Sequence, residues 1–284
     1  MKQTMLALAG AAALGVGFAG SAEAALPPIW EADFGAELTD LTFEDDEEQE
    51  VSLSFLFPYA GDIYSNIFAG TNGALQLGSL GDDDDIDYDH WEYLDEFIDD
   101  GAPIISPFNT DLDLSTTGKV FFNDFGDRAV FTWDEVGTNE NETALNSFQV
   151  QLLEDGTIIF GYAGILDGVD EDLIEDLDHG IVVGISKSDN RRDIDPVDFV
   201  SESPLTGETT IYQAWCYDEV DSCEYDDTSE SVTGPLNTAF NLDMKNLIFT
   251  PDGDSNYMVQ VQSNDTESVP EPASILGLVT IGAI

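Results

Sequence analysis

Two groups of aspartates have the residue type and spacing to bind a hard divalent cation. Calcium takes six to eight oxygen ligands, and closely spaced carboxylates on loops supply several of them. Neither group fits the twelve-residue EF-hand loop, which needs Gly at position six and Glu at position twelve. Calcium is therefore the one cofactor that the pattern indicates, and a solvated acidic loop is the alternative. The candidate ligands are Asp82, Asp83, Asp84, Asp85, Asp87, Asp111 and Asp113.

Residues with a recognisable catalytic spacing do not stand out. The chain has 59 acidic residues, so paired carboxylates occur throughout and single out no general acid and base. His90 and His179 lie in no nucleophile or metalloprotease motif. We expect a protein that is not an enzyme, with a secreted hydrolase acting on polysaccharide as the alternative.

The two cysteines, Cys216 and Cys223, lie seven positions apart in "WCYDEVDSC". An even pair in an oxidising compartment predicts a disulfide. Zinc binding is the competing interpretation, but two thiols and two histidines are few ligands for such a site. We expect Cys216 and Cys223 to be bonded to each other.

The net charge of −52, from 59 acidic and 7 basic residues, limits the partners. This field repels polyanions, which excludes nucleic acid and anionic membrane surfaces. The chain still has 42% hydrophobic and 11% aromatic residues, enough for a folded core. We expect a protein suited to a high-salt, halophilic setting or to one rich in divalent cations, because salt screens self-repulsion.

The N-terminus has the pattern of a secretory signal peptide. Lys2 precedes the apolar run 5–20, and Ala22 and Ala24 supply the small residues that signal peptidase recognises. The apolar run is short for a membrane span. We expect residues 1–24 to be removed and the protein to be exported.

The sequence pattern from residue 25 to 262 predicts short strands at regular spacing. "VSLSFLFPYA" alternates apolar and polar residues, and the pairs Gly126-Asp127 and Asp155-Gly156 each separate two such runs, as in hairpins. The prediction is an all-β domain, an antiparallel β-sandwich. Two acidic inserts, 81–100 and 165–180, have apolar residues at helical spacing and are expected to hold one or two short helices.

The order of motifs in residues 51–186 resembles the nidogen-like (NIDO) domain of extracellular adhesion proteins. An aromatic-rich strand leads to an Asn-Gly pair that we expect to form a type I′ turn. A Pro-Phe segment with aspartates and a Trp before an acidic pair follow, then an Asn-x-Phe-Gln strand. The resemblance implies an extracellular binding or adhesion function. The residues that carry it are Asn72, Gly73, Pro107, Phe108, Asp111, Asp113, Trp133, Asp134, Glu135, Asn146, Phe148 and Gln149.

The C-terminal segment resembles the PEP-CTERM sorting signal of exported bacterial proteins. Residues 263–272 form a polar linker that ends in the motif Pro270, Glu271 and Pro272, and an apolar run occupies 273–284. That run would rise only about 15–18 Å as a helix, half of a bilayer core. We therefore expect it to be the start of a truncated sorting helix, the only part to meet a membrane before processing.

The two resemblances imply a bacterial protein of the cell surface or the biofilm matrix, processed by an exosortase. The expected partners are exopolysaccharide or other surface and matrix proteins. A calcium-dependent carbohydrate-binding module is a further alternative to adhesion.

Overall fold

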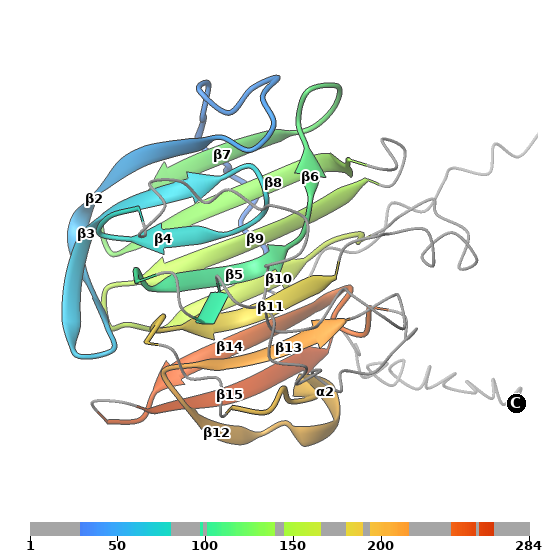
Figure 1. The fold of residues 1–284 in the computed structure, drawn as a ribbon. Helices are drawn as coiled ribbons and strands as arrows, with labels where there is room; N and C mark the ends of the chain where they lie inside the picture. Colours follow the sequence, from blue (N-terminus) through green and yellow to red (C-terminus); the bar gives the residue numbers. More distant parts are fainter. Residues whose placement is uncertain are drawn as a thin grey trace, which may run out of the picture.

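The structure, a computed structural model, describes residues 29–80, 97–98, 101–139, 145–165, 180–189, 194–215, 240–253 and 256–263. They form two antiparallel sheets packed as a sandwich, which confirms the predicted fold class (Figure 1). The strands are β1 (Ala36–Glu37), β2 (Glu48–Tyr59), β3 (Asp62–Gly70), β4 (Leu75–Leu77), β5 (Ile104–Asn109), β6 (Leu112–Asp113), β7 (Lys119–Asp124), β8 (Arg128–Thr138), β9 (Asn146–Leu153), β10 (Ile158–Tyr162), β11 (Ile181–Ser186), β12 (Leu205–Glu208), β13 (Ile211–Trp215), β14 (Lys245–Pro251) and β15 (Asn256–Ser263).

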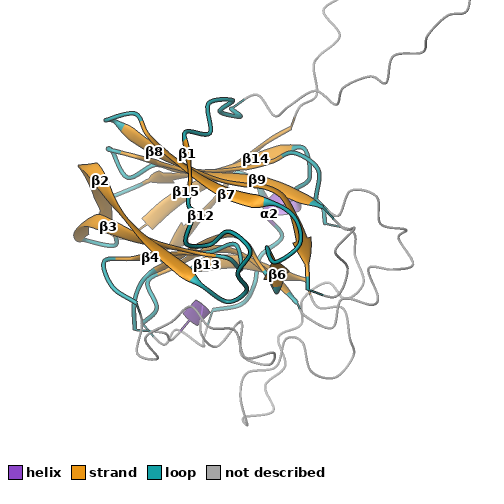
Figure 2. Cartoon of the chain, turned by 90° about the horizontal axis from the view of Figure 1, so that it is seen from above, coloured by secondary structure: helices purple, strands orange, loops and turns teal. Residues whose placement is uncertain are grey.

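The larger sheet has the order β1-β7-β8-β9-β10-β14-β15-β12, with β6 paired to β8. The smaller sheet has the order β13-β11-β5-β4-β3-β2. Figure 2 shows the two sheets as separate layers, with β7, β8, β9 and β14 in one and β3, β4 and β13 in the other. Strand β2 is an edge strand of the smaller sheet, and its hairpin partner β3 joins it to the rest.

Aromatic side chains fill the space between the sheets. The rings of Trp133 and Phe148 stack with centroids 5.0 Å apart, and Phe108 packs on Phe148 at 5.3 Å. All three side chains are fully buried. Alternation places them there, because every second residue of a strand faces the same side of its sheet. The Trp133 indole N–H donates to the Gly70 carbonyl, so this large side chain is buried without an unpaired donor.

The outer face of the larger sheet is covered by residues 29–34, which we call the N-terminal clasp. Gln149 donates to the carbonyl of Glu31 and accepts from its backbone N–H, and Gln151 donates to the carbonyl of Ile29. The ring of Trp30 lies over Gly161, where a Cβ would come within 3.5 Å of it. The side chains of Gln149 and Gln151 are therefore buried and satisfied by backbone groups.

Two of the three turns predicted from the sequence are present in the structure. Gly126 and Gly156 have positive φ in the β7–β8 and β9–β10 hairpins. The type I′ turn predicted at Asn72-Gly73 is wrong, because only Gly73 has a positive φ, of 80°. Asn72 is instead buried, and its side chain bonds to two other segments.

One described helix lies outside the acidic inserts, in which the sequence predicted helices. Helix α2 (Phe199–Glu202) follows Asp198, whose carboxylate caps it by accepting from the backbone N–H groups of Val200 and Ser201. Four residues are too few to give a helical period, which is why the sequence pattern did not indicate it. Phe97 and Ile98, in the first insert, have helical backbone and are buried.

The rest of both inserts, residues 81–96, 99–100 and 166–179, lies outside the described residues. Within the part of the chain that the structure describes, no helix combines the length and the apolar character that crossing a membrane requires.

Candidate functional site

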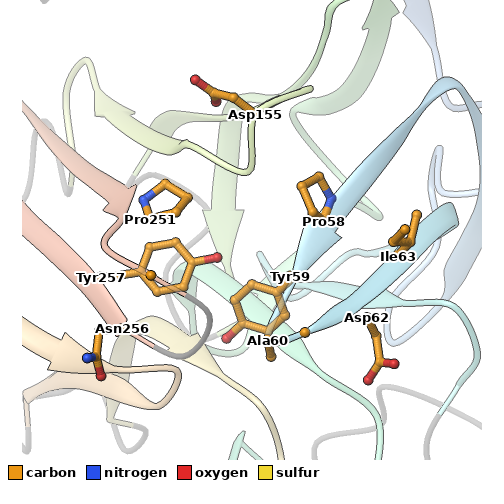
Figure 3. Close-up of a pocket in the computed structure, with 11 residues that line it drawn as sticks. Pro58, Tyr59, Ala60, Asp62, Ile63, Asp155, Pro251, Asn256 and Tyr257 are labelled. Atoms are coloured by element: carbon orange, nitrogen blue, oxygen red, sulfur yellow. The ribbon is translucent and has the colours of Figure 1, made fainter.

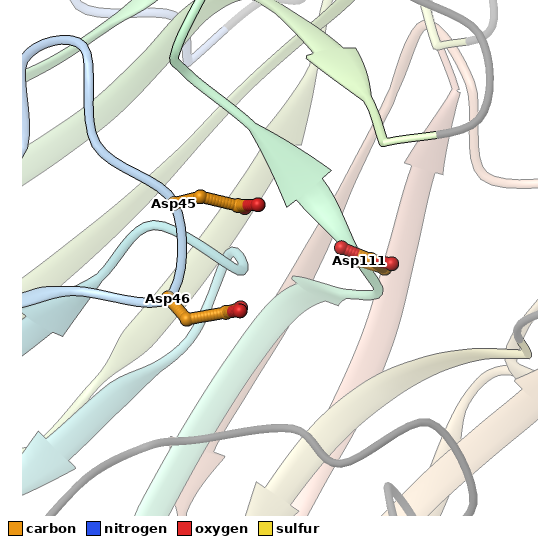
Figure 4. Close-up of side chains that lie close together, drawn as sticks. All are labelled: Asp45, Asp46 and Asp111. Carbon is orange, nitrogen blue, oxygen red and sulfur yellow. The ribbon is translucent and has the colours of Figure 1, made fainter.

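Four aspartates from two separate segments form what we call the carboxylate cluster: Asp45, Asp46, Asp111 and Asp113. Asp45 and Asp46 precede β2, Asp111 follows β5, and Asp113 belongs to β6. Carboxylate oxygens of Asp45, Asp46 and Asp111 lie within 4.8 Å of one another (Figure 4). Asp111 and Asp113 are buried, whereas Asp45 and Asp46 are exposed at the rim.

Asn72 joins the two segments that carry the cluster. Its Nδ2 donates to Asp46 Oδ1 over 2.7 Å, and its Oδ1 accepts from the backbone N–H of Leu112 over 2.9 Å. Thr71 adds two bonds to Glu47, one from its backbone N–H and one to its hydroxyl. The turn before β4 therefore fixes the loop before β2 against the segment after β5.

The two buried aspartates are held by local hydrogen bonds. Asp111 Oδ2 accepts from Asn139 Nδ2 at 3.0 Å, and Asp113 Oδ1 accepts from the backbone N–H of Ser115 at 2.6 Å. The donors of both bonds are neutral groups. A carboxylate offers about four lone-pair positions, so one such bond does not saturate it.

Negative charge is concentrated at the cluster. Burial, followed by the charges of Asp46, Asp113 and Asp111, raises the pKa of Asp45 to about 6. The two ion pairs among the described residues, Lys119–Glu37 and Arg128–Glu31, do not include any aspartate of the cluster.

This arrangement has the chemistry of a site for a hard cation. Calcium prefers several oxygen ligands from carboxylates and carbonyls in a flexible geometry, and oxygens from three side chains converge here. A divalent cation would offset the like-charge repulsion that the cluster otherwise carries. The donor set therefore fits calcium, with Asp45, Asp46 and Asp111 as first ligands and Asp113 beside them.

The structure brings together part of the predicted cation set. Asp111 and Asp113 lie in the cluster, but their neighbours Asp45 and Asp46 were missed, because only the fold brings the loop before β2 to the end of β5. The run "EDDEE" at 44–48 was the one available signal, and nothing in it pointed to Asp111.

The other predicted site residues lie outside the described residues, so their assigned roles stay predictions. They are the ligands Asp82, Asp83, Asp84, Asp85 and Asp87, the cysteines Cys216 and Cys223, the cleavage residues Ala22 and Ala24, and the sorting motif Pro270, Glu271 and Pro272.

The chain matches one family of known proteins. The family model described as "NIDO related" matches residues 22–217, well over half of the 284 residues. The match extends beyond the 51–186 region on which the sequence resemblance depended, and it includes the N-terminal clasp and both segments of the carboxylate cluster. No solved structure matches the chain.

Proposed function

The chain belongs to the NIDO-related family, and from this membership we propose that it is an exported bacterial surface or biofilm-matrix protein that acts by binding. NIDO domains are typically extracellular, and the family suggests an extracellular binding domain. The match over residues 22–217 is the observation that carries the proposal. On this proposal the sandwich attaches to exopolysaccharide or to other matrix proteins and catalyses no reaction.

The two ends of the chain support the export part of the proposal. The leader pattern at 1–24 would direct the chain out of the cytoplasm, and the motif Pro270, Glu271 and Pro272 would present it to an exosortase. The net charge of −52 supports neutral or cationic partners over polyanions, since like charges repel.

The carboxylate cluster supports a calcium-dependent form of this function. Asp46 and Asp111 belong to separate segments that Asn72 joins, so a bound cation would add a second link between them. Calcium would then strengthen the connection between the loops before β2 and after β5.

The test is the location and attachment of the full chain in producing cells. Antibodies against the sandwich should detect it in the extracellular matrix fraction, and replacing Pro270, Glu271 and Pro272 by alanine should shift it out of that fraction. Purified protein should sediment with isolated matrix, and chelation of calcium should reduce the bound amount. Detection of the unaltered chain in the cytoplasm alone would refute the export proposal, and failure to sediment would refute the binding proposal.

A further inference from the structure

A pocket of about 430 Å³ opens at the end of the sandwich where three hairpin turns meet (Figure 3). The turns connect β2 to β3, β9 to β10, and β14 to β15. The volume lies in the range of small-molecule sites. The pocket lies at the far end of β2 from the carboxylate cluster, because that strand begins two residues after Asp46 and ends at Tyr59.

The hairpins that form this pocket are fixed by close backbone packing. The β2–β3 turn has two residues, Ala60 and Gly61, both with positive φ, as a type I′ turn requires. A Cβ at Gly156 would lie 2.9 Å from the Pro58 carbonyl oxygen and 3.1 Å from the Pro251 ring. The three turns therefore contact one another directly, and the pocket is formed before any ligand arrives.

Two tyrosines lie at the base of the pocket and differ in their hydroxyl groups. Their ring centroids are 5.9 Å apart. The Tyr59 hydroxyl donates to the carbonyl of Thr209 over 2.6 Å. The Tyr257 side chain is only 4% exposed, and its hydroxyl has no hydrogen-bond partner among the described residues. Figure 3 shows this hydroxyl pointing toward the space beneath Pro58 and Pro251, so it is available to a ligand.

The remaining polar groups of the pocket include both acceptors and donors. The carboxylates of Asp62 and Asp155 are exposed at its rim, and Asp155 uses one oxygen to accept from the backbone N–H of Thr157. The Asn256 amide can donate and accept, and the Tyr257 hydroxyl keeps its proton because burial raises its pKa. The residues that line the pocket include no lysine or arginine.

We propose that this pocket binds a neutral saccharide. Sugar hydroxyls donate and accept at once, which matches two carboxylates, an amide and a phenol hydroxyl. The rings of Pro58 and Pro251 offer apolar surface to the C–H faces of a sugar ring. The two carboxylates repel uronates and phosphates. A cationic ligand would use the acceptors and leave the donor groups of Tyr257 and Asn256 without partners.

This inference rests on the proposed binding function and gives the chemical class of its ligand. The full chain is titrated by calorimetry and by NMR with neutral oligosaccharides, with uronate oligosaccharides, and with oligolysine, each in low and in molar salt. Neutral oligosaccharides should bind, with affinity that changes little with salt, and uronates should not.

Variants identify the pocket as the site of binding. Tyr257→Phe removes an unpartnered hydroxyl, so the thermal midpoint should stay the same while affinity for the neutral saccharide falls about tenfold, the effect of one lost hydrogen bond. Asp155→Asn should also weaken binding. The matched controls Tyr64→Phe and Asp127→Asn change the same groups outside the pocket and should leave the affinity unaltered.

The outcomes separate this inference from the proposed function. Absence of binding across the neutral panel, binding of oligolysine alone that disappears in molar salt, or binding that both pocket variants retain would overturn the saccharide site. If pocket variants sediment with isolated matrix as well as the parent does, the binding function stands and the pocket inference fails. If the saccharide binds at the pocket but the chain is never exported, the pocket inference stands and the proposed function fails.

Discussion

The two ends of strand β2 present different kinds of surface. Before its first residue lie Asp45 and Asp46, part of a cluster of four carboxylates held between loops by a few side-chain hydrogen bonds. After its last residues, Pro58 and Tyr59, lies a pocket lined by three hairpins, in which Gly156 of one packs against Pro58 and Pro251 of the other two. Twelve residues of strand separate the two by roughly 40 Å.

The difference shows how one strand can support two modes of recognition. At the cluster, charge is concentrated and the binding energy would come from relieving repulsion, so it should depend on pH, salt and calcium. At the pocket, hydrogen-bonding groups and proline rings would meet a neutral ligand, so binding should depend little on salt and calcium. Changes at each end should therefore have separate effects.

The largest expected effect comes from breaking the turn that organises the cluster. Gly73 has φ of 80°, and a Cβ there would lie 2.1 Å from the Phe108 carbonyl oxygen. Gly73→Ala should lower the free energy of unfolding by roughly 2–4 kcal/mol, since backbone strain and a steric clash add. Urea denaturation measures the loss.

A matched control separates the clash from the strain. Gly126 has φ of 92°, but a Cβ there would have nothing within 4 Å. Gly126→Ala should cost only roughly 1–2 kcal/mol, the strain alone. Equal losses in the two variants would show that the contact with Phe108 does not matter.

Calcium should stabilise the protein by binding at the carboxylate cluster, and it should leave ligand binding at the pocket unchanged. If the site binds with the millimolar-range affinity common in extracellular modules, calcium at about 100 times the dissociation constant adds about 2.7 kcal/mol to the free energy of unfolding. Thermal denaturation with and without calcium measures this gain. Asp46→Asn and Asp111→Asn should abolish it, while Asp127→Asn, in a distant hairpin turn, should retain it. Calorimetry that detects no calcium uptake would contradict the prediction.

The smallest effect should appear in the pH dependence of Asp45 without calcium. Its pKa in the folded protein, about 6, is above the ordinary value of 3.8, so the folded state binds the proton more tightly. Stability should therefore fall as the pH rises from 4 to 6 and stay lower above that. Asp45→Asn should remove this fall and stabilise the protein at pH 7 by about 1 kcal/mol, a value reduced for the partial exposure of the carboxylate.

Salt provides the check on that last prediction. Molar salt should reduce the difference between parent and variant without removing it, because it screens the repulsion from Asp46, Asp113 and Asp111 but leaves the burial of Asp45 unchanged. A difference of the same size in molar salt would mean that burial alone, and not the neighbouring charges, raises the pKa of Asp45.

The sequence predicted the strand patterns well and the contacts between distant parts of the chain poorly. Period-two alternation predicted β2, β8 and β9, because alternation is a property of a single strand, and it is the alternation that puts Trp133 and Phe148 on the core side in the structure. The cluster depends on which loops meet, and that follows from strand order, which alternation does not encode. Asn72 shows the same limit: its neighbour Gly73 suggested a turn, but its role in bonding to Asp46 and Leu112 depends on tertiary contacts.

The pocket could not be predicted for a related reason. Tyr257, Pro251 and Pro58 belong to hairpins far apart in the chain, and each has an ordinary sequence context. Gln149 and Gln151 alternate with apolar residues of β9 in the sequence, and only the fold brings the N-terminal clasp over both. Polar residues that bond to backbone groups are buried without any mark in the hydrophobic pattern.

The N-terminal clasp also limits how much of the chain an exopeptidase could remove. If the leader is cut after Ala24, only residues 25–28 precede Ile29, whose carbonyl accepts from Gln151. Trimming by an aminopeptidase beyond Ile29 would require the clasp to detach from β9. A chain exposed to such a protease should therefore keep the clasp as long as the sandwich is folded.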